Sequence, residues 1–232
     1  MVGDVVHGND ISSLNCGDHP VSRAAAGIEP LNRPSTNAMR NGTSQPLTYQ
    51  DLSRFRTPEG FRGRSALVVQ LWWLFDALLF RPSPQILFGW RRWLLRLFGA
   101  EIGKGVLIRP SVEITYPWKV AIGDYGWIGD NAVLYSLAEI RIGAHSVISQ
   151  HSYLCAGSHD IESTSFGITG APIIVGSQCW IASHVFVAPG VTIGDGTVVG
   201  ARSAVFHDLP PASICTGTPA RATRPRPRPS KP

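Results

Sequence analysis

The stretch Val187-Ala-Pro-Gly-Val-Thr-Ile193-Gly-Asp-Gly-Thr-Val-Val199-Gly-Ala-Arg-Ser-Ala-Val205 places an aliphatic residue at every sixth position. The same period extends back along the chain in groups of three. The five groups are Ile102, Ile108, Ile114; Ile122, Ile128, Leu134; Ile142, Ile148, Leu154; Val175, Ile181, Val187; and Ile193, Val199, Val205. Glycine follows the aliphatic residue in seven of these fifteen hexads, whereas chance would give about one or two. A repeat of this kind is typical of a solenoid.

Three hexads make one coil of a triangular prism, because each hexad supplies one short strand and one turn. The aliphatic side chain points toward the axis, and we expect the glycine after it to relieve the backbone at the corner. Small residues four positions after the aliphatic residue are expected to fill the inner corner; they are Ala132, Ser146, Ser152, Ser158, Thr197 and Ser203. The sequence therefore predicts a mainly β fold, a parallel β-helix of about five coils over residues 101–222.

The spacing between coils predicts where the chain leaves the prism. Coils that start at 102, 122 and 142 are 20 residues apart, two more than three hexads, which indicates a two-residue insertion in each of the first turns. The next start, at 175, comes 33 residues after 142, which exceeds one 18-residue coil by 15. We therefore expect a loop insertion at about 160–174, and long insertions in repeat folds often carry the binding function.

The segments outside the repeat differ in composition. Residues 1–48 mix Gly, Asn, Ser and Pro without a sustained period, which indicates a disordered leader. Residues 49–100 are expected to form an N-terminal helical cap, with helices from Ser65 to Phe80 and from Gln85 to Phe98. Residues 223–232 form an Arg/Pro-rich tail that is expected to be extended and mobile.

The second predicted helix is amphipathic. Its apolar face comprises Ile86, Trp90, Trp93, Leu94 and Leu97. Arg92 and Arg96 lie roughly opposite that face. Two interpretations stay open: the helical pair packs on the first coil and caps it, or it offers a basic amphipathic surface to the inner leaflet of the membrane.

Charge and cysteine usage exclude several classes of protein. Residues 54–109 carry ten Lys and Arg against three acids, residues 110–220 carry three against eight, and the last twelve residues add +5. Because basic flanks surround an acidic body, we expect no nucleic-acid partner. The four cysteines form no CxxC pair, so neither a zinc site nor a disulfide framework is signalled. The apolar run 66–80 would reach only about 22 Å as a helix, too short for a membrane span. We expect a cytoplasmic protein without a metal, with peripheral contact at the inner membrane as the alternative.

At this point the chain resembles the hexapeptide-repeat acyltransferases, a family that includes galactoside, maltose and nodulation-factor acetyltransferases. The resemblance rests on the hexads, Ser158-His159-Asp160, Trp180-Ile-Ala-Ser183, Pro189-Gly-Val-Thr-Ile-Gly194 and Gly217-Thr-Pro-Ala-Arg221. Arg109-Pro-Ser111, Tyr116-Pro-Trp118, Ile148-Ser-Gln150 and Tyr153-Leu-Cys155 are similar to the colanic acid and exopolysaccharide biosynthesis group. What the resemblance implies, over residues 50 to 222, is a left-handed β-helix that forms a homotrimer and binds acetyl-CoA as donor between neighbouring prisms.

His159 is the candidate catalytic residue. A sugar hydroxyl has a pKa far above 7, so its attack on a thioester needs a base within hydrogen-bond reach, and imidazole suits that role near neutral pH. His159 stands where the insertion leaves the third coil, and this position matches the family's catalytic histidine. The sequence therefore predicts an O-acetyltransferase that moves acetyl from acetyl-CoA to a hydroxyl of a sugar, oligosaccharide or exopolysaccharide precursor.

The resemblance also implies the binding residues. Asn131 and Tyr153 are the candidates for binding the acceptor. The candidates for binding acetyl-CoA are Trp180, Ala182, Ser183, Gly200, Ala201, Arg202, Thr218, Pro219 and Arg221. Many relatives have Gly-Ala-Gly where this chain has Gly200-Ala201-Arg202, so either the backbone tolerates a side chain at Arg202 or its guanidinium points at a phosphate.

Two alternatives from other classes use the same prism. A zinc enzyme of the γ-carbonic-anhydrase type needs three histidines, two of them closely spaced, and His145 and His151 lie six positions apart. A non-catalytic scaffold would keep the prism without the reaction. His159, the insertion and the Gly-Thr-Pro-Ala closure favour the acetyltransferase over both.

Overall fold

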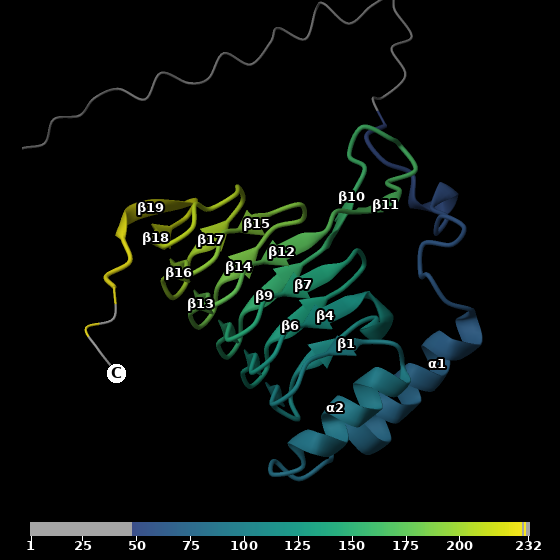
Figure 1. Ribbon diagram of the computed structural model, residues 1–232. Helices are drawn as coiled ribbons and strands as arrows, with labels where there is room; N and C mark the ends of the chain where they lie inside the picture. The colour runs from purple at the N-terminus through teal and green to yellow at the C-terminus, as the bar shows by residue number, and fades with distance from the viewer. Residues whose placement is uncertain (1–47, 229, 231–232) are drawn as a thin grey trace, which may run out of the picture. The chain divides into compact units, whose positions relative to one another are not determined.

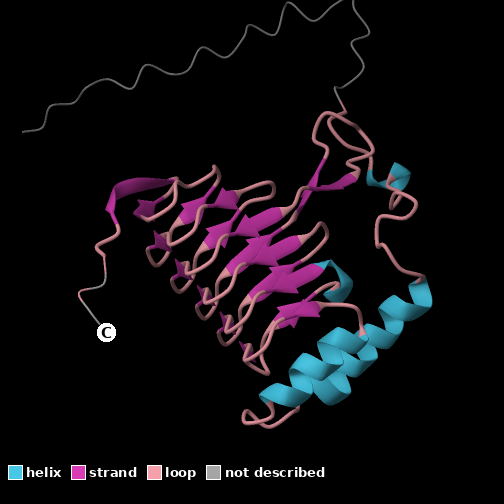
Figure 2. Ribbon diagram, in the orientation of Figure 1, coloured by secondary structure: helices cyan, strands magenta, loops and turns pink. Residues whose placement is uncertain are grey.

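The computed structural model describes residues 48–228 and 230, so the predicted leader lies outside the described residues apart from Thr48. Three parallel sheets, which we name A, B and C, form the sides of a prism (Figures 1 and 2). Sheet A contains β1 (Glu101–Ile102), β4 (Val120–Ile122), β7 (Ile140–Ile142), β12 (Ile173–Val175) and β15 (Thr192–Ile193). Sheet B contains β2 (Leu107–Ile108), β5 (Trp127–Ile128), β8 (Val147–Ile148), β13 (Trp180–Ile181), β16 (Val198–Val199), β18 (Ser213–Gly217) and the antiparallel β19 (Ala220–Pro225). Sheet C contains β3 (Glu113–Ile114), β6 (Val133–Tyr135), β9 (Tyr153–Cys155), β14 (Phe186–Val187) and β17 (Ala204–Val205).

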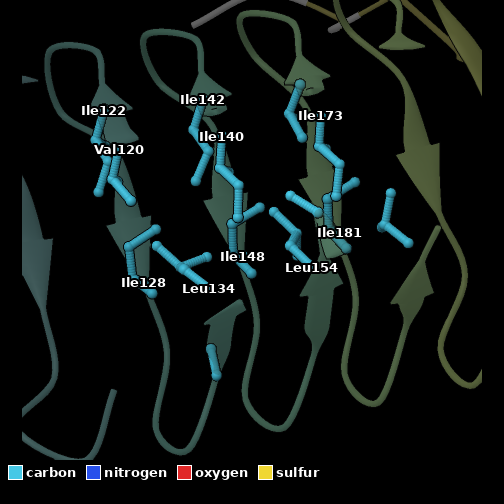
Figure 3. Close-up of a cluster of buried hydrophobic side chains, with 14 of the residues drawn as sticks. Val120, Ile122, Ile128, Leu134, Ile140, Ile142, Ile148, Leu154, Ile173 and Ile181 are labelled. Carbon is cyan, nitrogen blue, oxygen red and sulfur yellow. The ribbon is translucent and has the colours of Figure 1, made fainter. Parts of the chain in front are cut away.

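The hexad period sets the core. All fifteen aliphatic residues of the repeat are buried, none more than 7% exposed, and Figure 3 shows several of them pointing between the strands. The predicted five coils are confirmed, and a partial sixth follows them. Leu209 bridges to Ile193 of sheet A, and β18 pairs with β16 of sheet B. The stack therefore continues past Leu209-Pro-Pro211. Cys215, six positions after Leu209, is buried like the aliphatic residues of the hexads.

The predicted role of the repeat glycines is wrong. Gly103 and Gly143 do not take the left-handed conformation, which instead falls two residues further on, for example at Tyr125 and His145. A Cβ on Gly143 would come within 2.5 Å of the backbone of the next coil, and one on Gly103 within 2.6 Å. Glycine is needed here because adjacent coils approach closely, not because the chain turns.

The predicted inner-corner residues are buried with one exception. Ser146 and Ser152 also donate hydrogen bonds of 2.7 Å to carbonyls of the next coil. Ser158 is exposed, because the chain has already left the prism there. The insertion is a hairpin in which β10 (Gly157–His159) pairs antiparallel with β11 (Ile168–Gly170), so it begins earlier than predicted.

The two-residue insertions lie at the corner between sheets C and A. In the first coil this corner holds η3 (Pro117–Lys119), a short 3-10 helix. The predicted tail is partly wrong: β19 extends to Pro225, and Arg226 donates hydrogen bonds to the carbonyls of Gln178 and Gly196. The outer edge of β18 would otherwise be unpaired, so the chain folds back to cover it.

The N-terminal segment is helical only in part. After η1 (Leu52–Arg54), α1 (Ala66–Phe75) runs into a π-helical turn, η2 (Asp76–Phe80), and α2 (Phe88–Leu97) returns beside it. The predicted start of the first helix at Ser65 is correct, because Ser65 is the N-cap of α1, although its side chain makes no capping hydrogen bond. No helix in the described part of the chain is long and apolar enough to cross a membrane.

The orientation of α2 corrects the predicted faces. In each coil after the first, the backbone carbonyls of the inward aliphatic residues accept hydrogen bonds from amides of the preceding coil. The Ile128 carbonyl, for example, accepts a hydrogen bond from the Arg109 amide. The first coil has no predecessor, so its carbonyls need other donors. Arg91 reaches the carbonyl of Ile108 at 2.6 Å, Arg96 that of Ile102 at 2.9 Å, and the Trp72 indole that of Ile114 at 2.9 Å.

The helical pair is thus a polar cap on the open end of the prism. Arg91 is completely buried, and its guanidinium also bonds to Ser83, Pro84 and Gln85. Because the arginines face the prism, most of the predicted apolar face of α2 is turned outward: Trp93 and Leu97 are exposed, whereas Leu94 is buried. The prediction that the helices pack on the first coil is confirmed; the prediction of which face does so is wrong.

Candidate active site

His159 lies at the end of β10, outside the prism, where the hairpin leaves the corner between sheets C and A (Figure 1). Its imidazole is exposed and stacks on the ring of Phe166 at 4.2 Å between centroids with an 8° interplanar angle. Its Nδ1 lies 3.0 Å from the carbonyl oxygen of Phe166. Because a carbonyl only accepts, Nδ1 carries the proton in the neutral ring and Nε2 has a free lone pair.

The turn of the hairpin holds Phe166 in place. Phe166 adopts a left-handed conformation with φ of 50°, and its amide donates to the carbonyl of Ser163 at 3.0 Å. The amide of Asp160 donates to the carbonyl of Gly167 at 2.8 Å, closing the hairpin on the other side of Phe166. The Phe166 ring therefore fixes the plane of the His159 imidazole, and the Phe166 carbonyl fixes its tautomer.

A segment far away in sequence also reaches the hairpin. The amide of Asp51 donates to the carbonyl of Thr164 at 2.7 Å, and the Phe55 ring lies 6.5 Å from that of His159. Sequence reasoning missed both Phe55 and Phe166. Phe55 belongs to no repeat, so no signal would have found it, whereas Phe166 lies in the predicted insertion and was an aromatic residue seven positions from the histidine.

Tyr153 lies on the outer face of sheet C, on the side of the prism next to His159. It is part of an aromatic row in which its ring is 6.0 Å from Tyr135 and 6.1 Å from Phe186. Burial raises the pKa of Tyr153 to about 12. Tyr153 is thus a neutral phenol on the outer face of sheet C, and Tyr135, which sequence reasoning missed, lies beside it.

Asn131 is not brought to His159 within the chain. It occupies the turn between β5 and β6, at the corner between sheets B and C, with φ of 54°. The backbone amide of Asn131 donates a hydrogen bond to the Ser111 hydroxyl at 3.0 Å. The same left-handed turn position recurs at His151, His184 and Arg202 in the coils above, so Asn131 is one member of a corner row.

The predicted acetyl-CoA residues form one continuous strip at the corner between sheets B and C. Trp180 is half-exposed on the outer face of β13, and its indole donates to the Ser149 hydroxyl at 3.0 Å. Ala182 and Ser183 follow in the turn. Gly200, Ala201 and Arg202 occupy the same turn one coil on, where the amide of Arg202 donates to the Ser183 carbonyl at 3.0 Å. The left-handed backbone at Arg202 therefore tolerates a side chain, and that side chain is exposed.

The strip continues into the turn between β18 and β19. Thr216 lies directly against Gly200, and the Gly217 amide donates to Ser203 at 3.1 Å. Thr218, which precedes a cis peptide bond to Pro219, is exposed in this turn, and Arg221 is exposed near the start of β19. In the other direction, the outer face of sheet B has a depression of about 580 Å³ that reaches Ser149, Gln150 and His151. Its polar lining next to Trp180 extends the strip toward the first coils.

The histidines of the zinc alternative lie apart. His145 stacks on Tyr125 at the corner between sheets A and B, and His151 stacks on His184 at the corner between sheets B and C. Among residues 48–228, no group of three side chains is placed to hold a metal ion. The arrangement gives no support to the γ-carbonic-anhydrase interpretation.

The candidate residues therefore fall into two separate groups within one chain. His159 and Phe166 are at the corner between sheets C and A, and the strip from Trp180 to Arg221 is at the corner between sheets B and C. Sheet C lies between them.

Comparison with known proteins agrees with this geometry. Residues 172–207 match the family model "Bacterial transferase hexapeptide (six repeats)". The chain is 63% identical over 177 residues to the "Putative colanic acid biosynthesis acetyltransferase WcaF" of Escherichia coli K12, which covers 76% of this chain and 97% of that protein. It is 32% identical to the galactoside O-acetyltransferase of the same organism over 58% of this chain and 68% of that protein.

Solved structures give the same result. The galactoside acetyltransferase in complex with coenzyme A superposes with a TM-score of 0.65 at 27% identity, covering 73% of this chain and 84% of that one. A hexapeptide-repeat acetyltransferase of Vibrio cholerae complexed with acetyl coenzyme A has a TM-score of 0.65 at 28% identity, covering 72% and 92%. With the parallel β-solenoid and the relative at 63% identity, the chain belongs to the hexapeptide-repeat acetyltransferases, in the group of the colanic acid biosynthesis enzyme.

Proposed function

We propose that this enzyme transfers acetyl from acetyl-CoA to a hydroxyl of a sugar in an exopolysaccharide precursor, with His159 as general base. The hydrogen bond from His159 Nδ1 to the Phe166 carbonyl carries this proposal. It leaves Nε2 as a proton acceptor on an exposed ring, which is the state that a general base requires.

The reaction divides into two proton transfers. Nε2 accepts the proton of the sugar hydroxyl as the oxygen attacks the thioester carbonyl carbon, and a tetrahedral intermediate forms. When the carbon–sulfur bond breaks, the imidazolium returns the proton to the departing CoA thiolate. The products are the O-acetyl sugar and free CoA, and His159 is neutral again. The Phe166 carbonyl stabilises the imidazolium in between, because its oxygen accepts from the charged ring.

The strip from Trp180 to Arg221 is the proposed donor site. The half-exposed indole of Trp180 offers an apolar surface to a pantetheine arm, and the small residues Ala182 and Gly200 leave room beside it. Arg202 and Arg221 are exposed cations suited to phosphates. Two structural relatives carry coenzyme A or acetyl coenzyme A in their own structures. Dependence on this donor places the proposed reaction in the cytoplasm.

The proposed acceptor site lies around the hairpin. Phe55 and Phe166 supply apolar faces of the kind on which sugar rings pack, and the Tyr153 phenol supplies a hydrogen-bond donor. The names of two relatives point to a sugar acceptor, one in colanic acid biosynthesis and one a galactoside. Asn131 can contribute only from another subunit, given its distant corner.

A homotrimer would complete the site. In the proposed assembly three prisms stand side by side with parallel axes, and the His159 hairpin of one subunit meets the donor strip of its neighbour. The outer faces of sheets B and C carry apolar rows that suit such contacts; on sheet B, Trp127, Val147, Trp180 and Val198 are in register. The separation of His159 from the strip within one chain supports this assembly.

The test is acetyl transfer with defined acceptors. The purified enzyme is mixed with acetyl-CoA and a panel of free sugars, nucleotide sugars and exopolysaccharide repeat oligosaccharides. Release of free thiol is followed, and the product is identified by mass spectrometry. We expect thiol release that depends on a sugar, together with a product heavier by one acetyl group. Thiol release that is the same with and without every acceptor would contradict the proposal.

A further inference from the structure

The outer side of the helical cap is a large exposed apolar surface. We name it the cap face and define it by Leu67, Leu71, Leu74, Leu78, Ile86, Trp93 and Leu97. Leu67, Leu71 and Leu74 lie on one side of α1, and Leu78 follows in η2. Trp93 and Leu97 lie on one side of α2, and Ile86 lies in the turn that precedes this helix. The two helices lie side by side, joined by a hydrogen bond from the Trp90 indole to the Leu79 carbonyl and by Phe98 packing against Phe75.

The position of the cap face follows from the polar side of the cap. Arg91, Arg96 and Trp72 are held by carbonyls of the first coil, so the opposite sides of both helices point away from the prism (Figure 2). Ile86 is 83% exposed and Leu67 69%. A contiguous apolar surface of this kind on the outside of a rigid element marks a contact site.

Charge selects the partner. Between residues 62 and 97, five arginines keep full or partial exposure, namely Arg62, Arg64, Arg81, Arg92 and Arg96. Arg92 and Arg96 reach back to carbonyls of the first coil, and Arg81 pairs with Asp76 and Glu113, so these side chains do not form a free rim around the cap face. The five arginines minus these two acids still leave a net charge of +3 on the cap. A second copy of the cap face would bring two such positive ends together, and the repulsion disfavours that pairing. Anionic lipid headgroups are complementary to this charge.

We infer that the cap face binds the surface of an anionic lipid bilayer. The leucines and Ile86 enter the boundary between headgroups and acyl chains, Trp93 lies at that boundary, and the net positive charge of the cap attracts the anionic headgroups. One step rests on the proposed function: in a trimer with parallel prisms, rotation places all three cap faces at the same end. Three coplanar contacts bind a flat surface far more strongly than one.

Vesicle flotation tests this inference. The full-length protein is mixed with vesicles of phosphatidylcholine alone, or with about 30% phosphatidylglycerol, at low and at high salt. We expect the protein to float with the anionic vesicles and to be released as salt rises. Leu74→Glu/Leu78→Glu should lower the bound fraction at least tenfold, because charges replace leucines that would enter the bilayer. Both positions are exposed, so the melting temperature should not change.

Ile174→Glu is the matched control. Ile174 is also an exposed aliphatic residue, but it lies on the outer face of sheet A, and its variant should float like the unmodified protein. Equal flotation of the Leu74/Leu78 variant, or no flotation of the unmodified protein, would overturn the inference. A solution hexamer that the same variant splits into trimers would also overturn it, because the cap face would then be a protein interface.

The outcome is independent of catalysis. Thiol release with a soluble acceptor should be the same for the Leu74/Leu78 variant as for the unmodified enzyme. If the protein floats but acetylates no sugar, the proposed function fails and the bilayer contact stands. If it acetylates sugars but does not float, the reverse holds.

Discussion

Coil 3 of the prism and the hairpin that leaves it are continuous in sequence, yet their side chains face opposite surroundings. In the coil, Ile142, Ile148 and Leu154 are buried to within 3% of complete exclusion from solvent. In the hairpin, beginning a few residues later, Ser158, His159 and Ile161 are exposed. The coil is held by the next coil on each side, whereas the hairpin is held by its own strand pair and by contacts of Phe166 and Asp51. The difference teaches that the buried core and the candidate catalytic histidine lie in separate parts of the fold.

The largest expected effect of a substitution is on catalysis in the hairpin. His159→Ala should lower kcat/KM by about 10²- to 10⁴-fold, or about 3 to 5 kcal/mol, because the general base is lost. The melting temperature and the affinity for CoA should stay unchanged, since the His159 ring is exposed and lies outside the prism core. Steady-state kinetics and calorimetric CoA binding measure both. His207→Ala is the control; a residual activity above a tenth in the His159 variant would refute the assignment.

The next prediction concerns the free energy of unfolding, for which the coil and not the hairpin is the sensitive region. Ile148→Ala in the coil should lower the free energy of unfolding by about 2 to 5 kcal/mol, because it removes buried methyl groups and leaves a cavity. Ile161→Ala in the hairpin should change it by less than about 0.5 kcal/mol, because Ile161 is 81% exposed. Urea unfolding at one fixed protein concentration measures both. Similar losses for the two variants would show that the hairpin shares the core.

A pair of glycines sharpens the same contrast. Gly143→Ala places a methyl group within 2.5 Å of the backbone of the next coil, and we expect it to destabilise the fold by about 1 to 3 kcal/mol. Gly167→Ala, in the hairpin, meets nothing closer than 4.0 Å and should be nearly neutral. Thermal unfolding of the two variants decides it. A neutral Gly143 variant would mean that the coils can separate enough to admit a methyl group.

The smallest effect concerns a residue of the coil that faces the site. Tyr153→Phe should raise the KM for the acceptor by a factor that corresponds to about 0.5 to 1.5 kcal/mol, the range for one hydrogen bond. Because burial raises the pKa of Tyr153 to about 12, the phenol stays protonated from pH 6 to 10. The pH profiles of variant and unmodified enzyme should therefore have the same shape. A basic limb that disappears in the variant would show that Tyr153 titrates.

The sequence could predict the parts of the molecule that follow the repeat, and it could not predict contacts made by segments outside the repeat. The period places every inward side chain, and residues at equal phase in successive coils stack, so Ala182, Gly200 and Thr216 fall on one strip. The insertion follows from the same arithmetic. Phe55 could not be found, because 104 residues separate it from His159 and no repeat relates them.

The buried Arg91 could not be found for a different reason. Patterns of amphipathicity assign arginine to solvent, and they take no account of carbonyls left open at the end of a stack. The same omission reversed the predicted faces of α2. A helix that packs on the end of a solenoid meets backbone polar groups, whereas a helix that packs on the face of a sheet meets side chains.

Because both ends of the stack are capped, the number of coils alone sets the distance between the two ends. The cap fits the open carbonyls of one coil, and β19 covers the free edge of another, so neither depends on how many coils lie between them. Each coil adds one strand spacing of about 4.8 Å. The number of coils between the cap and the hairpin therefore sets the distance of His159 from the cap. A duplication or deletion of one coil below the hairpin would move His159 by one strand spacing without a change at either end.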